Sequence, residues 1–211
     1  MDFRLLGPVS FGSPQQSGVL AVLLLSSHVT LEDLVCAVWG PDAPAGAAST
    51  VRTYVSRLRL LTGCAIVAEA GGYRMVVDPA TVDVSVFLSK LRLGQLKGAL
   101  DLWRGRALDG LSGAFFDSRR TWLDQLRATA QEDLWAASLG DPAVIGELVA
   151  ATAAEPYRER VWELLIEALV RRGRCAEALA AQRRITRLLD EDLGLRPGPG
   201  LRVQRLSTPR A

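Results

Sequence analysis

The stretch from Thr50 to Leu61 constrains the fold more than any other part of this chain. Its apolar residues recur at helical spacing and make one stripe of an amphipathic helix: Val51, Val55, Leu58 and Leu61. Arginine, threonine and serine lie off that stripe, at Arg52, Thr53, Ser56, Arg57 and Arg59. We therefore predict a helix that packs on one side and presents basic and hydroxyl side chains on the other.

A β-hairpin is predicted directly after this helix. Gly63 ends the helix, and residues 65–77 contain two runs typical of strands around a Gly-rich turn. Upstream, Thr30 is a good N-cap for a helix from Leu31 to Val38. A winged helix-turn-helix has this order of elements: a helix, a turn, a second helix and a hairpin. Arginine, threonine and serine on the second helix suit a DNA major groove, because they can contact base edges and phosphates.

The N-terminal segment is predicted to start with extended backbone. Residues 3–11 are expected to form a strand or a short hairpin, followed by a helix that opens at Pro14 or Ser17. Ser49 or Thr50 is expected to cap the second helix of the helix-turn-helix. A first domain of mixed α and β structure is therefore predicted over residues 1–80.

From Val82 onward the pattern is helical almost without a break. Helices are expected near 84–93, 95–104, 117–139, 142–154, 157–172, 175–192 and 199–206. Two successive helix pairs end about 34 residues apart, at Glu155 and Asp190, which is the period of tetratricopeptide repeats. We therefore expect residues 81–211 to form an all-α, tetratricopeptide-like domain, so that the whole protein is mainly α. Such stacks of helix pairs present concave surfaces to other proteins.

Several motifs, taken in order along the chain, resemble those of a known family. The first three are Leu31-Glu-Asp-Leu-Val-Cys-Ala-Val-Trp39-Gly40, Thr50-Val-Arg-Thr-Tyr-Val-Ser-Arg-Leu-Arg59 and Gly71-Gly-Tyr-Arg74. The C-terminal ones are Pro156-Tyr-Arg-Glu-Arg160, Gly173-Arg-Cys-Ala-Glu-Ala178 and Glu191-Asp-Leu-Gly-Leu-Arg-Pro-Gly-Pro199. Together they resemble the Streptomyces antibiotic regulatory proteins, with their winged-helix DNA-binding domain and bacterial transcriptional activation domain. The likeness covers nearly the whole chain, which looks like a compact and divergent member.

The resemblance implies a DNA-binding transcriptional regulator that activates a secondary-metabolite (antibiotic) biosynthetic gene cluster. A homodimer would bind direct repeats in a promoter and recruit RNA polymerase through its sigma and alpha subunits. The residues expected to contact double-stranded DNA are Ser49, Thr50, Arg52, Thr53, Ser56, Arg57, Arg59 and Arg74. By the family pattern, Ser49, Thr53 and Arg57 would face bases or nearby phosphates, and Arg52 and Arg59 would touch the backbone. An ordinary solvated helix face is the alternative interpretation of these arginines.

Other residues depart from the family pattern. Glu69 stands before the hairpin turn, where relatives carry an arginine, and a carboxylate there would be repelled by DNA. Relatives tend to have basic residues where Gln15, Gln16 and Ser17 stand, and the N-terminal sheet looks shortened. Residues 1–80 hold five arginines and six carboxylates, a net charge of −1. We therefore expect weak DNA binding by a single copy, strengthened by dimerisation and by polymerase.

These departures leave a second hypothesis open. The chain would then be a family derivative without autonomous DNA binding, acting as an adaptor or co-regulator through protein–protein contacts. A continuous positive strip over the four arginines of the predicted interface would favour DNA. A strip broken by Glu69 and Asp42 would favour the adaptor.

Motifs and composition argue against other function classes. Neither a nucleophile elbow nor a phosphate-cradling loop is present, and His28 is the single histidine, so we expect no enzyme activity, cofactor, ATP requirement or metal. The longest apolar run, Val19–Leu25, is too short to cross a membrane and does not follow a basic segment as in a signal peptide, so we expect a cytoplasmic protein. The three cysteines and five tryptophans are expected to pack in the core, with Trp122 best placed for an exposed contact.

Overall fold

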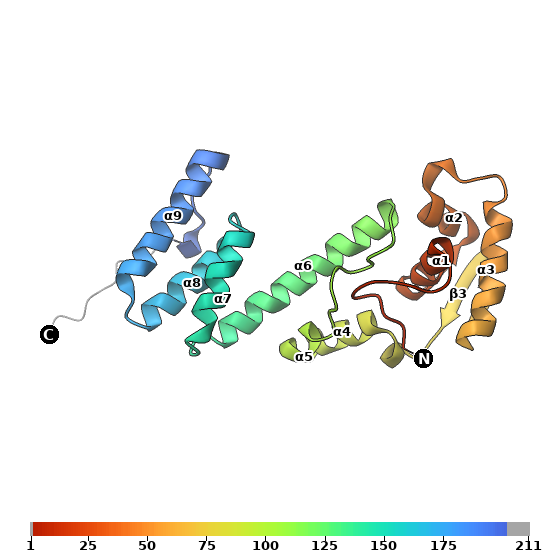
Figure 1. The fold of residues 1–211 in the computed structure, drawn as a ribbon, viewed down its shortest axis with the longest axis horizontal. Coiled ribbons are helices and arrows are strands. Elements are labelled where there is room, and N and C mark those ends of the chain that lie inside the picture. The colour runs from red at the N-terminus through yellow and green to blue at the C-terminus, as the bar shows by residue number, and fades with distance from the viewer. Residues whose placement is uncertain (1, 202–211) are drawn as a thin grey trace. The chain divides into compact units, whose positions relative to one another are not determined.

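The computed structural model of this protein describes residues 2–201, and the chain forms two compact units. Unit 1 covers Met1–Ala128 and unit 2 covers Thr129–Ala211. The chain is mainly helical, with a small antiparallel sheet in unit 1, as the sequence predicts (Figure 1).

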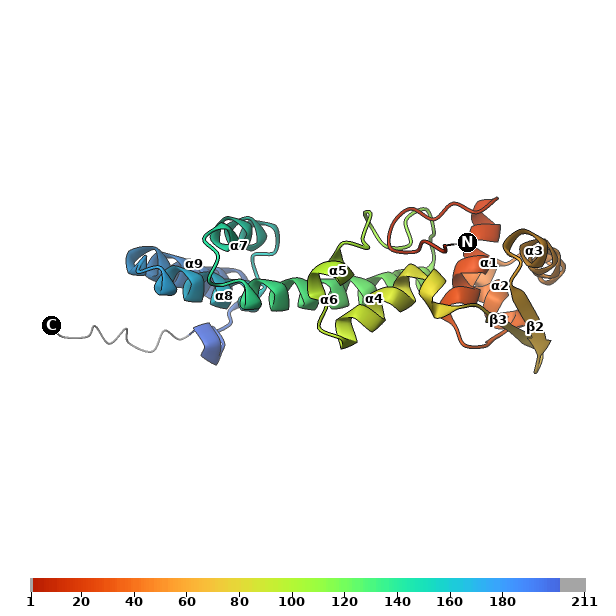
Figure 2. The same cartoon turned by 90° about the horizontal axis from the view of Figure 1, so that it is seen from below.

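Along its described residues, unit 1 contains five helices, a three-stranded sheet and the start of a sixth helix. The helices are α1 (Pro14–Leu25), α2 (Leu31–Trp39), α3 (Ala47–Thr62), α4 (Asp83–Arg92) and α5 (Leu96–Leu100), and α6 (Ala114–Ala137) runs from this unit into the next. The strands are β1 (Val29–Thr30), β2 (Ala65–Glu69) and β3 (Gly72–Val76). Figures 1 and 2 show α1, α2 and α3 gathered beside the β2–β3 hairpin.

Helix α1 lies in the core of unit 1 because its sequence is apolar on nearly every side. The five residues from Val19 to Leu23 are each at most 3% exposed. Ser13 caps the helix by accepting a hydrogen bond from the Gln16 amide, and Pro14 occupies the first turn, where the missing N–H is not needed. Of the two predicted starts, Pro14 and Ser17, the structure confirms Pro14.

Helix α2 also begins where the sequence predicts. The Thr30 hydroxyl accepts a hydrogen bond from the Asp33 amide at 3.0 Å and donates one to the Asp33 carboxylate at 2.7 Å. Leu34 and Ala37 are the residues that this helix buries. The cap therefore sets the start of the helix, and the positions of Leu34 and Ala37 determine the face that it turns to the core.

Helix α3 begins earlier than the sequence predicts. It starts at Ala47 with Gly46 as its N-cap, so neither Ser49 nor Thr50 is the cap. The Thr50 hydroxyl donates to the Gly46 carbonyl at 3.1 Å and accepts no backbone N–H of the first turn. The cap prediction is wrong because the turn before the helix, in which the Ala47 amide bonds to the Pro44 carbonyl at 2.9 Å, continues directly into it.

The predicted hairpin is confirmed. Its strands pair in antiparallel register from Ala65 with Val76 to Glu69 with Gly72. The two-residue turn, Ala70–Gly71, has φ angles of 46° and 74°, the left-handed backbone that such tight turns require. The turn therefore places Glu69 at the end of β2, next to the start of β3.

Strand β1 is too short for the sequence pattern to predict. It pairs with β3 through Val29 with Tyr73 and Thr30 with Gly72. A Cβ atom on Gly72 would lie 2.1 Å from the Val29 carbonyl oxygen, so only glycine allows this approach. The sheet order β1-β3-β2 leaves β2 as an edge strand beside the end of α3, which Gly63 terminates in a left-handed conformation, as predicted.

Residues 3–11 form no strand or hairpin, contrary to the prediction. Their backbone makes isolated bridges, one of them to Val82. The Asp83 carboxylate accepts hydrogen bonds from the amides of Leu5 and Leu6 at 2.8–3.0 Å. One side chain thus satisfies backbone donors that a neighbouring strand would otherwise have to pair.

The core of unit 1 extends past residue 80, where the sequence predicts the boundary between the two family domains. Phe87 of α4 and Phe116 and Leu123 of α6 are buried in the same core as α1. Arg120 of α6, only 5% exposed, donates to the Leu111 carbonyl at 2.8 Å and so joins α6 to the loop before it. Residues as far as Ala128 therefore pack with the N-terminal helices.

Helix α5 is shorter than the predicted helix over 95–104. It ends at Leu100, and the Arg104 amide instead donates to the Leu6 carbonyl at 2.8 Å. The chain leaves the helix because its backbone donors find partners in the N-terminal segment. Trp103, just after the helix, packs edge-on against Phe87 at 5.5 Å between ring centroids.

Unit 2 contains the end of α6 and three further helices within the described residues. They are α7 (Ala143–Ala154), α8 (Glu159–Arg171) and α9 (Cys175–Leu193), close to the predicted ranges. Trp162 and Leu164 of α8 are at most 1% exposed, and Ile185 of α9 is fully buried in the same core. Of the helix predicted near 199–206, Pro199–Leu201 forms a 3-10 turn and the rest lies outside the described residues.

Candidate nucleic-acid interface

Helix α3 has one buried face and one exposed face. Val51, Val55 and Leu58 are at most 1% exposed, as the apolar stripe predicts. The same stripe predicts that Leu61 is buried, but Leu61 is 61% exposed, so that part of the prediction is wrong. It lies on the last turn, where the helix no longer packs against the core, and its neighbour Leu60 is 84% exposed.

The exposed face carries most of the predicted DNA contacts. Two of the predicted contacts, Thr50 and Arg74, are half-buried. The other six are exposed: Ser49, Arg52, Thr53, Ser56, Arg57 and Arg59. The Thr50 and Thr53 hydroxyls donate to backbone carbonyls four residues earlier, at 3.1 and 3.2 Å. These threonines therefore have only oxygen lone pairs and methyl groups left for a ligand.

Arg59 joins the end of α3 to the hairpin. Its Nε donates to the Ile66 carbonyl of β2 at 2.8 Å, and its Nη2 donates to the same oxygen. In an antiparallel edge strand, alternate carbonyls point away from the neighbouring strand and need another donor. Arg59 supplies that donor, so its guanidinium is occupied within the fold.

Arg74 is also occupied, by the residue that the sequence marked as a departure from the family. Its Nε lies 2.7 Å from one oxygen of the Glu69 carboxylate and its Nη2 lies 3.3 Å from the other. The hydrogen bond from Arg74 lowers the pKa of Glu69 below its ordinary value, and the bond to Glu69 raises the pKa of Arg74. Each charge in the hairpin therefore has its counter-charge beside it.

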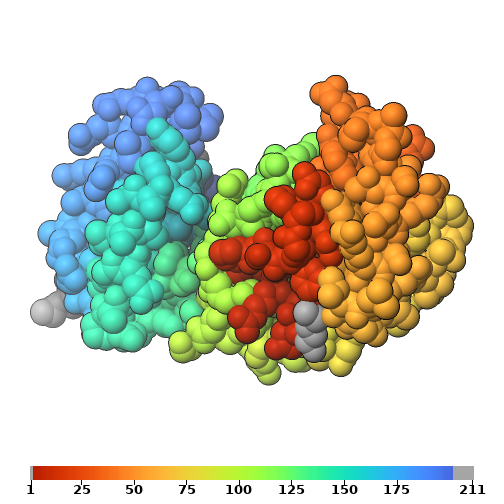
Figure 3. Space-filling model, turned by 45° about the vertical axis from the view of Figure 1, so that its right-hand side comes forward, coloured from red at the N-terminus to blue at the C-terminus, as the bar shows by residue number. Residues whose placement is uncertain are grey.

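Arg52 and Arg57 are the predicted arginines with open guanidinium groups. Within residues 2–201, neither makes an ion pair or a side-chain hydrogen bond. Arg52 lines a hollow of about 380 Å³ together with Glu69 and the hairpin turn. Figure 3 shows α3 in orange beside the hairpin in yellow. The predicted strip of four arginines thus divides into two open and two occupied side chains.

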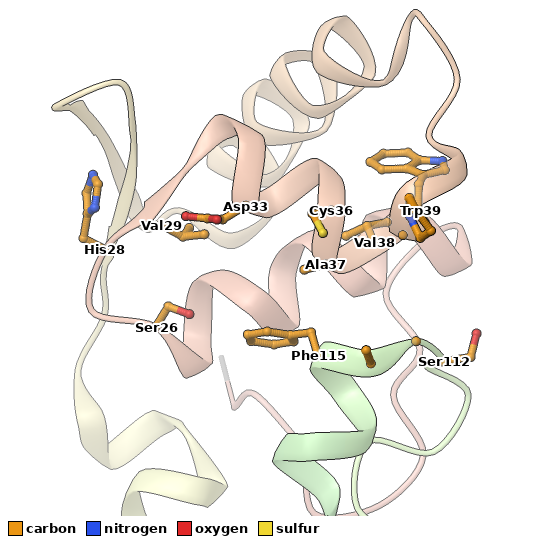
Figure 4. A pocket seen from close by; sticks show the side chains of 14 residues that line it. Ser26, His28, Val29, Asp33, Cys36, Ala37, Val38, Trp39, Ser112 and Phe115 are labelled. Carbon is orange, nitrogen blue, oxygen red and sulfur yellow. The ribbon is translucent and has the colours of Figure 1, made fainter.

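A larger cavity, of about 620 Å³, lies between α2 and the start of α6. Figure 4 shows Phe115 of α6 facing Ala37 and Cys36 of α2 across this space, with Asp33 on the same helix. None of the eight predicted contact residues lines it. The carboxylate of Asp33 would repel phosphate, so this cavity is separate from the candidate nucleic-acid interface.

The cysteines and tryptophans only partly follow the core prediction. Cys36 is exposed and Cys64 and Cys175 are half-buried, so the prediction for the cysteines is wrong. Trp162 is buried and Trp122 is 41% exposed, as predicted. Among residues 2–201, no three His, Cys, Asp or Glu side chains lie close enough together to hold a metal ion. Over the same residues, we find no helix with the length and apolar character needed to cross a membrane.

Comparisons with known proteins agree with the motifs. The bacterial transcriptional activator domain matches residues 89–206. The regulatory protein AfsR of Streptomyces griseus is 38% identical over 95% of this chain and 24% of its own length. The transcriptional regulatory protein EmbR of Mycobacterium tuberculosis is 34% identical over 96% of this chain and 62% of its own length. The transcriptional regulator RedD of Streptomyces coelicolor is 30% identical over 96% of this chain and 68% of its own length.

The fold is shared with a solved structure. Mycobacterium tuberculosis EmbR in complex with a low-affinity phosphopeptide has a TM-score of 0.88 and 33% identity, over 95% of this chain and 62% of that one. The relatives are transcriptional regulators and not enzymes, so this chain is of the transcriptional-regulator class. The chain belongs to the Streptomyces antibiotic regulatory protein family. It spans about a quarter of the length of AfsR and less than two thirds of EmbR.

Proposed function

We propose that this transcriptional regulator binds double-stranded DNA through a winged helix-turn-helix formed by α2, α3 and the β2–β3 hairpin. The outer face of α3 is the observation that carries the proposal. It presents hydroxyl groups at Ser49, Thr53 and Ser56, and open guanidinium groups at Arg52 and Arg57. The opposite face of α3 is buried, so the helix is held firmly enough to present these groups to a major groove.

We further propose that the protein is an activator of a secondary-metabolite gene cluster. In this proposal a homodimer binds direct repeats in a promoter, and a tetratricopeptide-like domain at residues 81–211 engages the sigma and alpha subunits of RNA polymerase. The family supports an activator, and AfsR and RedD are named regulators in Streptomyces. Two copies would double the phosphate contacts, which would offset the net charge of −1 in residues 1–80.

A second candidate function is favoured by the hairpin. Arg74 is neutralised by Glu69, and Arg59 is taken up by the Ile66 carbonyl, so half of the predicted basic strip serves the fold. A family member with so few open cations would act as an adaptor or co-regulator that meets DNA only through a partner. The two functions differ in whether the protein binds DNA on its own.

Fluorescence-polarisation titration of the full chain against labelled duplexes from its own gene neighbourhood would separate them. Titrations at low and moderate salt, with unrelated duplex as competitor, measure both specificity and the number of phosphates contacted. We expect competitor-resistant binding that weakens with salt and is weaker in Arg57→Ala than in the wild type. Arg92→Ala is the matched control, because Arg92 is an exposed arginine in the last turn of a different helix of unit 1.

Each result decides between the two functions. If a folded protein fails to bind any duplex at low salt, the DNA-binding proposal is wrong and the adaptor is favoured. If Arg57→Ala and Arg92→Ala weaken binding equally, binding is a general charge effect and α3 is not the recognition helix.

A further inference from the structure

The most exposed large apolar side chain among the described residues lies on α3. Leu60 is 84% exposed, although leucine ordinarily gains free energy by burial. It is not at a loose chain end, since the helix continues to Thr62 and is capped by Gly63. Within a proposed binding surface, a side chain so open is available to contact an apolar group on the ligand.

Leu60 continues the row of hydroxyl residues on the outer face of α3. Ser49, Thr53, Ser56 and Leu60 are spaced by four, three and four residues, which keeps them on one side of a helix. With about 100° per residue, Arg52 and Arg57 fall roughly 60–80° to either side of this row. The row is therefore the part of α3 that would point most directly at the floor of a groove, with a guanidinium on each flank.

The chemistry of this row limits which base it can distinguish. It contains no arginine or lysine for guanine and no asparagine or glutamine for adenine. Serine and threonine hydroxyls contact several bases and discriminate weakly, and the Thr53 hydroxyl already donates to the Ser49 carbonyl. The base feature left for the row to read is the C5-methyl group of thymine, which packs against apolar side chains.

We propose that Leu60 is a specificity-determining residue that reads thymine methyl groups in the major groove. This inference rests on the proposed DNA-binding function and makes it more specific. The operator would carry thymine at a defined position of each half-site, opposite the last turns of α3. Arg52 and Arg57 would hold the helix in place from its flanks.

Uracil substitution tests the proposal directly, because deoxyuridine differs from thymidine only by the missing methyl group. A randomised duplex library would first be enriched on the full-length protein to obtain a preferred sequence. That duplex would then be synthesised with uracil replacing thymine at one position at a time. Loss of one buried methyl contact should weaken binding about fourfold at the position that Leu60 reads.

Two variants assign the effect to one side chain. In Leu60→Ala, thymine and uracil duplexes should bind equally well at that position. Leu61→Ala is the matched control: it removes the same side chain from the adjacent position, off the row, and should keep the fourfold preference for thymine. Both leucines are exposed, so circular dichroism should show both variants folded.

The outcomes separate this inference from the function on which it rests. Binding without any thymine preference, or a preference that survives in Leu60→Ala, overturns the readout while DNA binding stands. Leu60 would then be open to a protein partner. A library that yields no enriched sequence, with no binding at low salt, overturns the proposed function and this inference with it.

Discussion

The outer face of α3 and the hairpin beside it carry the same basic residue in two different states. On α3, Arg52 and Arg57 make no intramolecular pairs within the described residues. In the hairpin, Arg74 is paired with Glu69, and Arg59 at the end of α3 is bonded to the Ile66 carbonyl of β2. The difference shows that a count of arginines overstates the positive charge available to DNA, because Glu69 offsets the charge of Arg74. Arg59 keeps its charge, but one edge of its guanidinium is held by a backbone carbonyl.

The partners of the two occupied arginines, Arg59 and Arg74, both come from the sheet. An edge strand exposes carbonyls, and a hairpin sets side chains of its two strands side by side. Arg59 and Arg74 both lie within reach of such groups. Arg59 also lies on α3, whose own backbone acceptors are used within the helix, but it is beside β2. Arg52 and Arg57 lie on the same helix and make no side-chain hydrogen bond or ion pair within residues 2–201.

The largest expected effect is on DNA affinity, and it distinguishes the open arginines from the occupied ones. Arg57→Ala should weaken operator binding by about 1–3 kcal/mol, because an open guanidinium contacts the ligand directly. The double variant Glu69→Gln/Arg74→Ala removes both paired charges together, so it should change the affinity by no more than about 0.5 kcal/mol. Both variants are measured by fluorescence polarisation on one duplex at one salt concentration. A larger loss in the double variant would place the hairpin, and not α3, at the centre of recognition.

The next effect is on the free energy of unfolding, and it also distinguishes an occupied arginine from an open one. Arg59→Ala should lower the free energy of unfolding by about 1 kcal/mol, because it leaves the Ile66 carbonyl without its donor. Arg57→Ala should leave stability nearly unchanged and serves as the control. Urea denaturation followed by circular dichroism measures both. Equal stability of the two variants would mean that the bond from Arg59 contributes nothing in solution.

A smaller effect follows from releasing Arg74. Glu69→Gln removes the negative charge, so the slope of log K against log salt should steepen by about 0.9, the value of one added phosphate contact. Glu69→Arg should steepen the slope further and tighten binding to all sequences. Glu191→Gln makes the same charge change on an exposed position of α9 and should leave the slope unaltered. An unchanged slope in both Glu69 variants would show that the hairpin stays away from the DNA.

The smallest effect is the pH dependence of the Glu69–Arg74 pair. The folded state lowers the pKa of Glu69 below the ordinary value of 4.5, because Arg74 donates to its carboxylate. The pair therefore stabilises the fold above pH 4.5, and this contribution is lost as the pH falls through the lowered pKa. The difference in unfolding free energy between wild type and Glu69→Gln should be small, as expected for an exposed pair, and should vanish in acid. A difference that grows as the pH falls would contradict this assignment.

Local sequence signals predicted most of the secondary structure. Thr30 as a cap, Pro14 at a helix start and Gly63 at a helix end act through the backbone of their immediate neighbours, so no distant contact is needed to read them. The failures have the opposite origin. Residues 3–11 form no strand because Asp83, far along the chain, takes their amides, and α5 ends early because Arg104 bonds to Leu6.

The same division holds for the candidate site. The spacing of residues in α3 is enough to predict a buried stripe with a polar and basic face opposite it, since a helix repeats every 3.6 residues wherever it lies. Which arginines on that face stay open was decided by the tertiary structure, because Ile66 and Glu69 reach Arg59 and Arg74 only once the hairpin has folded. Tertiary structure also decided that Leu61 faces solvent, because its exposure depends on where the core ends and not on its place in the apolar stripe.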